Sequence, residues 1–154
     1  NKESFLVTDL LSDIVQHYAI LVKEKEITLT LEGPHDLPPV LADVALVERA
    51  IQNLLDNALK FTPRGGQITI ALGAKSKAVE IAIADTGVGI PLKDQAYIFE
   101  RYKQFPTHDL ENKEGMGLGL AIVKKIVELH HSVISIRSLP GSGTVFWFQL
   151  PTVG

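Results

Sequence analysis

Two asparagines and a lysine at helical spacing are the groups in this sequence best suited to chemistry. In "NLLDNALKF", Asn57 follows Asn53 by four residues and Lys60 follows Asn57 by three, so on a helix the three side chains lie along one face. Two amide oxygens and an ammonium group suit a ligand that carries both a hard cation and an anion. Mg²⁺ takes oxygen ligands and usually shares them with phosphate, which makes magnesium polyphosphate the candidate. The alternative, favoured on this segment alone, is that the amides cap a neighbouring loop and Lys60 is solvated.

A helical wheel places these polar groups at the edge of a buried stripe. At about 100° per residue, five apolar residues form the stripe that should face the core: Val47, Ile51, Leu54, Ala58 and Phe61. Glu48, Gln52 and Asp56 fall on the opposite, solvent side. The two asparagines and the lysine lie along one edge of the stripe, where a half-buried amide keeps its polarity only if something supplies hydrogen-bond partners.

An aspartate and two glycines follow a strongly apolar segment in "IADTGVGIP". Asp85 ends the segment, and Gly87 and Gly89 come directly after it. The glycines would let a flat ligand approach the backbone, while the carboxylate accepts a hydrogen bond from an exocyclic amine. Adenine carries such a donor at its 6-position, whereas guanine carries a carbonyl oxygen that an anion would reject. The alternative is that Asp85 only ends the strand and sets up a turn, which is the usual case.

A second glycine-rich segment, "GMGLGLAIV", leads into a predicted helix. Gly115, Gly117 and Gly119 recur at every second position, and free N–H groups at a helix start attract phosphate. The segment lacks the GK[ST] ending of a P-loop and does not match the dinucleotide pattern G-x-G-x-x-G. A flexible helix start is the alternative. The third glycine pair, in "LPGSGTVFWF", indicates a hairpin turn.

The periodicity of apolar residues predicts the elements that position these groups. Helices are expected over residues 9–26, 44–61, 95–103 and 117–130, and strands over 27–33, 67–73, 78–85, 132–138 and 143–151. The strand before Asp85 is almost continuously apolar, which predicts cover on both of its faces. Together these elements predict a two-layer α/β sandwich, with a mixed, mostly antiparallel sheet of about five strands covered on one face by three helices.

Four segments in order carry a resemblance to a known family. "NLLDNALKF", "DTGVGI", "IFERYKQF" and "GMGLGLAIV" resemble the N, G1, F and G2 boxes of the ATP-binding domain of sensor histidine kinases. This domain belongs to the superfamily shared with gyrase, the heat-shock chaperone and mismatch-repair ATPases. The resemblance covers essentially the whole chain, and "GSGTVFWFQLP" matches the usual closing strand. It implies one catalytic domain over residues 1–154 with a Bergerat-type ATP-binding fold and a mobile ATP lid at about 103–116.

The resemblance also implies roles for individual residues. Asn57 would be the principal Mg²⁺ ligand, with Asn53 beside it on the metal or phosphate and Lys60 on phosphate. Asn53 and Lys60 are the implied catalytic residues. The remaining implied ATP contacts, from the base to the phosphates, are Phe61, Asp85, Gly87, Gly89, Ile90, Gly115, Met116, Gly117, Leu118, Gly119 and Thr144.

Two positions depart from the family pattern. Many members carry an arginine in the lid where this chain has Gln104, and Arg101 and Lys103 are the candidates to replace it. The Gly-Gly pair that commonly follows the third helix is replaced by His131-Ser132, so that turn is expected to differ. Neither change touches the adenine or metal positions.

The implied reaction is transfer of the γ-phosphoryl group of ATP to a histidine nitrogen on a preceding helical hairpin. None of the five histidines of this chain is interpreted as the acceptor; His17 is followed by a tyrosine and His108 lies in the expected lid. The chain is therefore expected to be incomplete without a phosphoacceptor dimerisation domain of the same parent protein. A response regulator is the expected downstream partner, with a monomeric isolated domain and a homodimeric parent.

Other functions remain open. ATPases of the same superfamily carry a glutamate where Asn53 stands, and an amide cannot take the proton of an attacking water. Hydrolysis by that route is therefore disfavoured. A regulatory module that binds ATP without transferring phosphate has the same sequence features as a kinase domain. A protein-serine kinase of the same superfamily is a lesser alternative, because the form "NLLDNALKFTP" resembles the histidine kinases more closely.

Composition excludes several other classes of protein. The net charge of −3 does not favour nucleic acid or anionic lipid as a partner, and the absence of cysteine excludes disulfides and thiolate metal sites. No apolar run is long enough for a membrane span, and we expect no signal peptide among these residues. Because the chain starts at Asn1 and its one methionine is Met116, we expect a segment of a longer protein. The absence of cysteine fits a reducing compartment, and we expect the segment to be cytoplasmic, in a parent protein that can itself be anchored in a membrane.

Overall fold

The structure is a computed structural model that describes residues 1–100 and 113–153, except for the side chains of residues 113–118. Its elements in chain order are β1 (Glu3–Phe5), α1 (Val7–Glu24), β2 (Thr28–Glu32), β3 (Val40–Ala42), α2 (Val44–Phe61), β4 (Gln67–Lys75), β5 (Ala78–Asp85), α3 (Leu92–Gln95), α4 (Lys113–Leu129), β6 (Ser135–Ser138) and β7 (Thr144–Pro151). None of the described helices combines the length and apolarity that crossing a bilayer requires.

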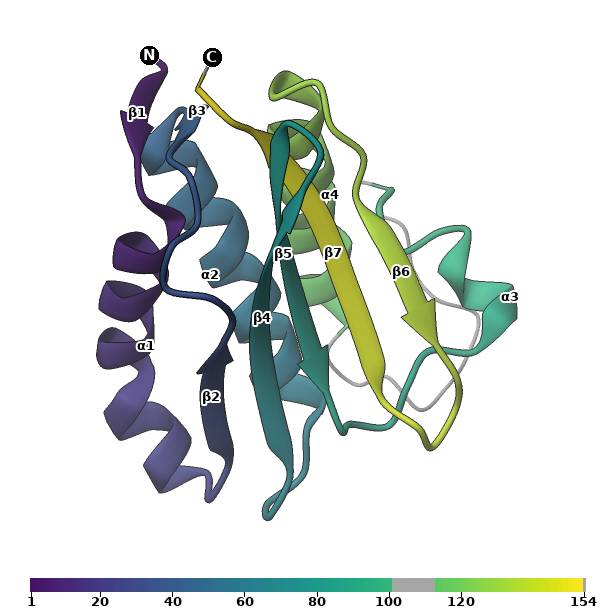
Figure 1. Cartoon of the computed structure of the whole chain (residues 1–154). Coiled ribbons are helices and arrows are strands. Elements are labelled where there is room, and N and C mark those ends of the chain that lie inside the picture. Colours follow the sequence, from purple (N-terminus) through teal and green to yellow (C-terminus); the bar gives the residue numbers. More distant parts are fainter. Residues whose placement is uncertain (101–112, 154) are drawn as a thin grey trace.

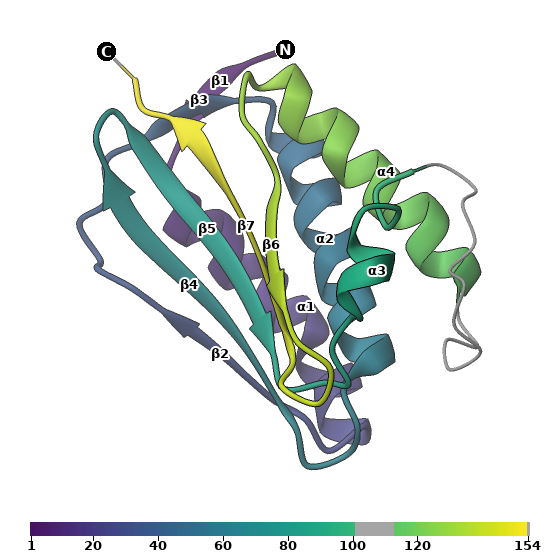
Figure 2. The same ribbon diagram turned by 90° about the vertical axis from the view of Figure 1, so that its right-hand side faces the viewer.

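Five strands form the main sheet in the order β2-β4-β5-β7-β6 (Figure 1). The pair β2–β4 is parallel, and the pairs β4–β5, β5–β7 and β6–β7 are antiparallel. Helices α1, α2 and α4 lie on one face of this sheet (Figure 2). The predicted two-layer sandwich, with a mixed and mostly antiparallel sheet of five strands covered by three helices, is confirmed. A separate antiparallel pair, β1–β3, lies at the end of the molecule where both termini lie, and was not predicted.

Strand β5 shows how the core forms between the two layers. Val79, Ile81 and Ile83 are buried toward the helices, and they alternate with half-exposed residues on the outer face. The prediction that this strand is covered on both faces is therefore wrong. Its apolar run is continuous because two of the outward positions are Ala82 and Ala84, which are small enough to stand on an exposed face.

Helix α2 is the element that carries the asparagines, and its start is capped by a side chain. The side chain of Asp43 caps its start by accepting a hydrogen bond from the Leu46 N–H at 3.1 Å. The buried face is wider than the predicted stripe because α2 lies between α1 and α4 (Figure 2); Phe61 is only half-buried. The buried residues are Val47, Ala50, Ile51, Leu54, Leu55, Ala58 and Leu59.

The segment between β5 and α4 differs from its prediction. The expected helix over residues 95–103 is wrong within the described residues: α3 ends at Gln95 and is followed by turns. The fixed φ of Pro91 favours a helix that begins directly after it. Helix α4 begins at Lys113, four residues before the predicted start, and so includes the end of the expected lid. Residues 103–112 of that lid, with Gln104 and His108, lie outside the described residues, as does Arg101.

Helix α4 ends in a Schellman motif that lacks the usual glycine. The N–H of Ser132 donates to the carbonyl of Val127 at 3.1 Å and the N–H of His131 donates to the carbonyl of Glu128 at 3.0 Å. His131 has a φ of 59°. The turn expected to differ from the Gly-Gly form therefore adopts the left-handed conformation that glycine favours.

His131→Gly should stabilise the protein by about 0.5–1 kcal/mol, because the histidine Cβ is strained at this positive φ and glycine is not. Urea denaturation followed by circular dichroism measures the effect. His131→Ala removes the same exposed side chain but keeps the Cβ, so it should give no comparable gain. An equal gain from both variants would show that the side chain, and not the backbone conformation, is responsible.

Candidate functional site

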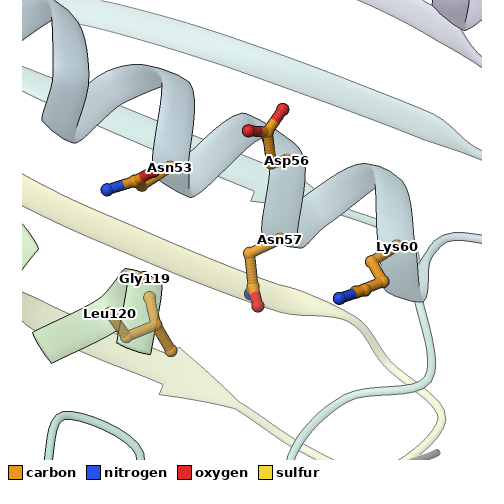
Figure 3. Close-up of a pocket in the computed structure, with 6 residues that line it drawn as sticks. All are labelled: Asn53, Asp56, Asn57, Lys60, Gly119 and Leu120. Carbon is orange, nitrogen blue, oxygen red and sulfur yellow. The ribbon is translucent and has the colours of Figure 1, made fainter. Parts of the chain in front are cut away.

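A pocket between α2 and α4 is lined by all four polar residues of the "NLLDNALKF" segment. It has a volume of about 250 Å³. The tips of Asn53, Asn57 and Lys60 project from the same side of α2, toward α4 (Figure 3). Its lining residues are Asn53, Asp56, Asn57, Lys60, Gly119 and Leu120. The structure thus brings four of the residues singled out in the sequence to one cavity.

Two amide atoms in this pocket are buried without a hydrogen-bond partner. They are Oδ1 of Asn57 and Nδ2 of Asn53. An unpaired buried polar group costs about 1–3 kcal/mol, so native proteins rarely retain one without a reason. The free oxygen of Asn57 suits a cation, and the free amide nitrogen of Asn53 suits an anionic oxygen. The exposed ammonium group of Lys60 adds a positive charge at the same site.

The donor set fits Mg²⁺ bound together with phosphate better than a metal held by protein alone. Among residues 1–100 and 113–153, no three His, Cys, Asp or Glu side chains gather where they could hold a metal ion. A cation at Asn57 Oδ1 would therefore complete its shell with water and ligand oxygens, as Mg²⁺ commonly does with phosphates. The pocket residues fit such a group.

Asp56 lines the same pocket, but its carboxylate points away from the amide of Asn57 (Figure 3). This agrees with its predicted place on the solvent side of α2. Its Oδ1 accepts a hydrogen bond of 2.8 Å from the hydroxyl of Tyr18 in α1. Burial, and then this hydrogen bond, raise the pKa of Tyr18, so the phenol remains a donor. Asp56 therefore helps to hold α1 against α2 and is not aimed at the pocket interior.

A second cluster lies at the end of β5. Oδ1 of Asp85 accepts a hydrogen bond from the Gly87 N–H at 2.8 Å, and Asp85 pairs with Thr144 across the β5–β7 ladder. Burial raises the pKa of the Asp85 carboxyl, and hydrogen bonds from the backbone N–H groups of Gly87 and Thr144 oppose this shift. A half-buried carboxylate of this kind is an acceptor placed to select a ligand with a matching donor.

The loop after Asp85 connects the two clusters. The Val88 N–H donates to the carbonyl of Phe61, the last residue of α2, at 3.4 Å. A Cβ at Gly87 would meet that same carbonyl, and Gly89, with a φ of 77°, lies directly against the carbonyl of Leu139. These close approaches explain why both positions are glycine. The loop is therefore fixed against the end of α2 that carries Lys60.

The structure brings some of the predicted residues together and leaves others untested. Ile90 is buried beside the Asp85 cluster, and a Cβ at Gly119 would meet nothing within 4 Å, so that position is open toward the pocket. Gly115, Met116, Gly117 and Leu118 lie within the backbone of α4, and their side-chain surroundings are outside the described residues. Their implied contacts with ATP stay predictions.

Sequence reasoning missed three residues that organise the two clusters: Tyr18, Gln95 and Ser138. Each acts through a partner distant in the sequence, as in the hydrogen bonds Tyr18–Asp56 and Ser138–Ile90. A single serine before a turn, or one tyrosine in an amphipathic helix, carries no local signal for such contacts. Only the strand register and the packing of α1 on α2 reveal them.

Known proteins match this chain over most of its length. The model of the family described as histidine kinase-, DNA gyrase B-, and HSP90-like ATPase matches residues 42–154. The adaptive-response sensory kinase SasA of Rippkaea orientalis is 43% identical over 143 residues, covering 92% of this chain and 36% of that protein. The sensor histidine kinase TmoS of Ectopseudomonas mendocina is 43% identical over 134 residues, covering 85% of this chain and 14% of that protein. The chain thus spans about a third of the first relative's length and less of the second's.

Solved structures share the fold. The catalytic domain of the histidine kinase ThkA is 25% identical with a TM-score of 0.85, covering 99% of this chain and 96% of that chain. Full-length ShkA in complex with AMPPNP is 27% identical with a TM-score of 0.85, covering 100% of this chain and 32% of that chain. ThkA in complex with the response regulator protein TrrA is 24% identical with a TM-score of 0.80 over 99% of this chain and 42% of that one, a likeness of fold alone.

Proposed function

This chain belongs to the family of histidine kinase-, DNA gyrase B- and HSP90-like ATPases, as a histidine kinase catalytic domain, and we propose that it binds ATP with Mg²⁺ and presents the γ-phosphate to a histidine of another domain. The observation that carries this proposal is the pair of unpaired amide atoms of Asn53 and Asn57 beside Lys60. A ligand with both a hard cation and an anionic chain would satisfy all three.

Phosphoryl transfer depends mainly on positioning and on charge stabilisation, so the residues of this pocket have limited but specific tasks. Asn57 would hold the metal through Oδ1, and Lys60 would donate hydrogen bonds to phosphate oxygens. Asn53 would donate through Nδ2 in its present orientation, or offer Oδ1 to the metal with its amide turned over. Mg²⁺, when bound, supplies neutralisation of phosphate charge. Together these groups would orient the terminal phosphate for an incoming nucleophile.

The Asp85 cluster would select the base. An ionised carboxylate accepts a hydrogen bond from the 6-amino group of adenine and repels the 6-carbonyl oxygen of guanine. Gly87 and Gly89 let the loop that follows Asp85 pack closely against the carbonyls of Phe61 and Leu139, and the Val88 N–H of this loop donates to the Phe61 carbonyl at the end of α2. A nucleotide with its base at Asp85 and its phosphates in the pocket would therefore extend past the end of α2 that carries Lys60.

The phosphoacceptor would come from a separate helical hairpin of the parent protein. His130 is buried, with Nδ1 at 2.8 Å from the Ile126 carbonyl and Nε2 accepting from the Asp43 N–H at 3.0 Å, so its ring is committed to packing. His17 and His131 are exposed and neither precedes an acid. His35 precedes Asp36, but it lies in the loop between β2 and β3 and not on a helix. A response regulator would then receive the phosphoryl group.

Hydrolysis of ATP is the second candidate, and the described part of the pocket does not favour it. Activation of water needs a base, and Asn53 stands where the hydrolases of this superfamily carry glutamate. The one carboxylate among the lining residues, that of Asp56, points away from Asn57 (Figure 3). Binding of ATP without any transfer is the remaining alternative.

Phosphotransfer to the isolated hairpin separates these functions. The domain, mixed with the histidine-bearing hairpin of its parent and γ-labelled Mg-ATP, should give a hairpin label that is stable to alkali and labile to acid. Lys60→Ala should reduce the labelling rate strongly, whereas Lys124→Ala, an exposed change on α4, should not. Release of labelled phosphate without a labelled hairpin would indicate an ATPase, and binding without either product would indicate a regulatory module.

ATP affinity should fall at acidic pH, starting at a higher pH than an exposed aspartate would give. Binding needs the ionised form of Asp85, and burial raises the pKa of this carboxyl. Protonation then competes with ATP, and below that pKa the affinity should fall about tenfold per pH unit. Calorimetric titrations across the acidic range measure the profile. Asp56→Asn should leave the profile unchanged, so a flat profile, or one that moves with Asp56, would contradict this assignment.

A further inference from the structure

We infer that Ser138 is a positioning residue that fixes the direction of the Thr144 hydroxyl, and that this hydroxyl joins Asp85 in selecting a 6-amino purine over a 6-carbonyl purine. The inference rests on the proposed function, because it assigns a further determinant of specificity to the proposed adenine site. It depends on the hydrogen-bond geometry of residues that the sequence alone did not connect.

Asp85, Thr144 and Ser138 form one polar row across three adjacent strands. Thr144 of β7 pairs with Asp85 of β5 on one side and with Ser138 of β6 on the other. Side chains at directly paired positions share a face of the sheet and lie about 4.5–5.5 Å apart. The next row toward the centre is apolar and consists of Ile83, Phe146 and Ile136. The polar row therefore ends the core on its helix-facing side.

The neighbours of Ser138 Oγ determine where its single hydrogen points. The Ile90 N–H lies at 2.8 Å and can only donate to it. The Gly143 carbonyl lies at 3.0 Å and can only accept from it. The Thr144 hydroxyl, at 2.7 Å, can do either. Because a serine hydroxyl has one hydrogen and two lone pairs, all three contacts are made at once only if Ser138 donates to Gly143 and accepts from Thr144.

This arrangement leaves the Thr144 oxygen as an acceptor. Its hydrogen is directed toward Ser138, so its lone pairs are what it can offer to a ligand. Asp85, on the paired position, is an acceptor when ionised. Two acceptors in one row match the two hydrogens of a 6-amino group and are repelled by a 6-carbonyl oxygen. Ser138 would thus act on the base through Thr144, without touching it.

Gln95 holds Ser138 and the glycine loop together. Its Nε2 donates to the Ile90 carbonyl at 2.8 Å and to the Ser138 carbonyl at 2.9 Å. The Gly141 N–H also donates to the Val88 carbonyl at 2.7 Å, which fixes the β6–β7 turn against the loop. Ser138 is buried, with 8% of its surface exposed. Its hydroxyl is therefore held in a rigid surrounding, as a fixed hydrogen direction requires.

The test compares the affinities for Mg-ATP and Mg-ITP, whose bases differ at the 6-position. In wild-type protein ATP should bind more tightly. Ser138→Ala frees the Thr144 hydroxyl to rotate and donate toward the base, so the ratio of the two affinities should fall about fivefold to tenfold, the effect of one hydrogen bond. Ser135→Ala, at the other end of β6, is the matched control and should leave the ratio unchanged. Thermal melting of each variant without nucleotide measures the effect of the substitution on stability separately.

If Ser138 has a purely structural role, Ser138→Ala should weaken the binding of both nucleotides equally and leave the ratio of their affinities unchanged. That result would overturn the inference. Because Ser138 acts through Thr144, adding Ser138→Ala to Thr144→Val should lower the ratio no further, and an additive loss would also overturn it. If Ser138→Ala does not fold, Thr144→Val alone must lower the ratio. Wild-type protein that binds neither nucleotide overturns the proposed function and this inference with it, whereas normal ATP binding with an unchanged ratio in the variants overturns the inference alone.

Discussion

Asp85→Asn should abolish the binding of ATP at concentrations that saturate the wild-type domain. The amide has one acceptor oxygen where the carboxylate has two, and its NH₂ group would face the amino group of adenine. Loss of a charge-assisted hydrogen bond together with this repulsion should weaken binding about 100-fold or more. At about 100 times Kd, Mg-ATP should stabilise the wild-type domain by about 2.7 kcal/mol, and this gain should disappear in the variant. Melting scans with Mg-ATP and with Mg-GTP measure it, and GTP should not stabilise the wild-type domain.

The same substitution should not destabilise the free domain at neutral pH. Burial raises the pKa of Asp85 in the folded state, so the folded state holds this proton more tightly than the unfolded state does. Stability therefore falls as pH rises from the unfolded pKa to the folded pKa, and the loss persists at neutral pH. The uncharged asparagine avoids that loss and can still accept from the Gly87 N–H.

Glu80→Gln is the matched control, because Glu80 lies on the same strand but on the outer face. Glu80→Gln should leave the gain in melting temperature on adding ATP, and the preference for ATP over GTP, as they are in the wild type. Stabilisation of the Asp85→Asn protein by ATP to the wild-type extent would show that the base binds elsewhere. An unfolded Asp85→Asn protein would show that the carboxylate has a structural role instead.

Asn57→Ala should remove the dependence of ATP binding on Mg²⁺, with a loss of affinity of about 10-fold to 100-fold in the presence of the metal, as for a charge-assisted contact. Without Mg²⁺ the variant and the wild type should bind ATP with similar, weak affinity. The free variant should be at least as stable as the wild type, because the substitution removes a buried oxygen that has no partner. Titrations at several magnesium concentrations measure the effect.

Gln52→Ala provides the control on the same helix. Gln52 is half-buried on the side of α2 where its backbone carbonyl accepts from Tyr18, away from the pocket. Its replacement should change ATP affinity by less than about twofold. Similar losses from Asn57→Ala and Gln52→Ala would mean that the ligand does not contact the face of α2 that carries the asparagines.

Helix α2 shows how much the sequence could predict. Its bounds agree with the predicted residues 44–61. The edge position of Asn53, Asn57 and Lys60 and most of the buried stripe follow from a period of about 3.6 residues, although the observed buried face is wider than the stripe and Phe61 is only half-buried. The order of strands and helices was also sufficient to predict the two-layer fold. The resemblance to the histidine kinase ATP-binding domain then assigned chemistry to groups that, on one helix, favoured a purely structural interpretation.

Other features depend on contacts that no local pattern contains. The pair β1–β3 consists of two strands of three residues each, too short for an alternating signal. The outer face of β5 looked covered because Ala82 and Ala84 are apolar, although they are small enough for an exposed face. The role of Ser138 depends on the register of β6 against β7, which a sequence does not specify. Hydrophobic periodicity predicts which face of an element is buried, but not which partner each polar atom meets.

A crystal structure of the domain with Mg²⁺ and AMPPNP is the most direct test of the proposed site. The metal should lie on Asn57 Oδ1 and the phosphates beside Asn53 and Lys60, in the pocket between α2 and α4, with the adenine amino group on the carboxylate of Asp85. A nucleotide bound outside that pocket, or one whose base lies away from Asp85 while its phosphates occupy it, would contradict the central claim.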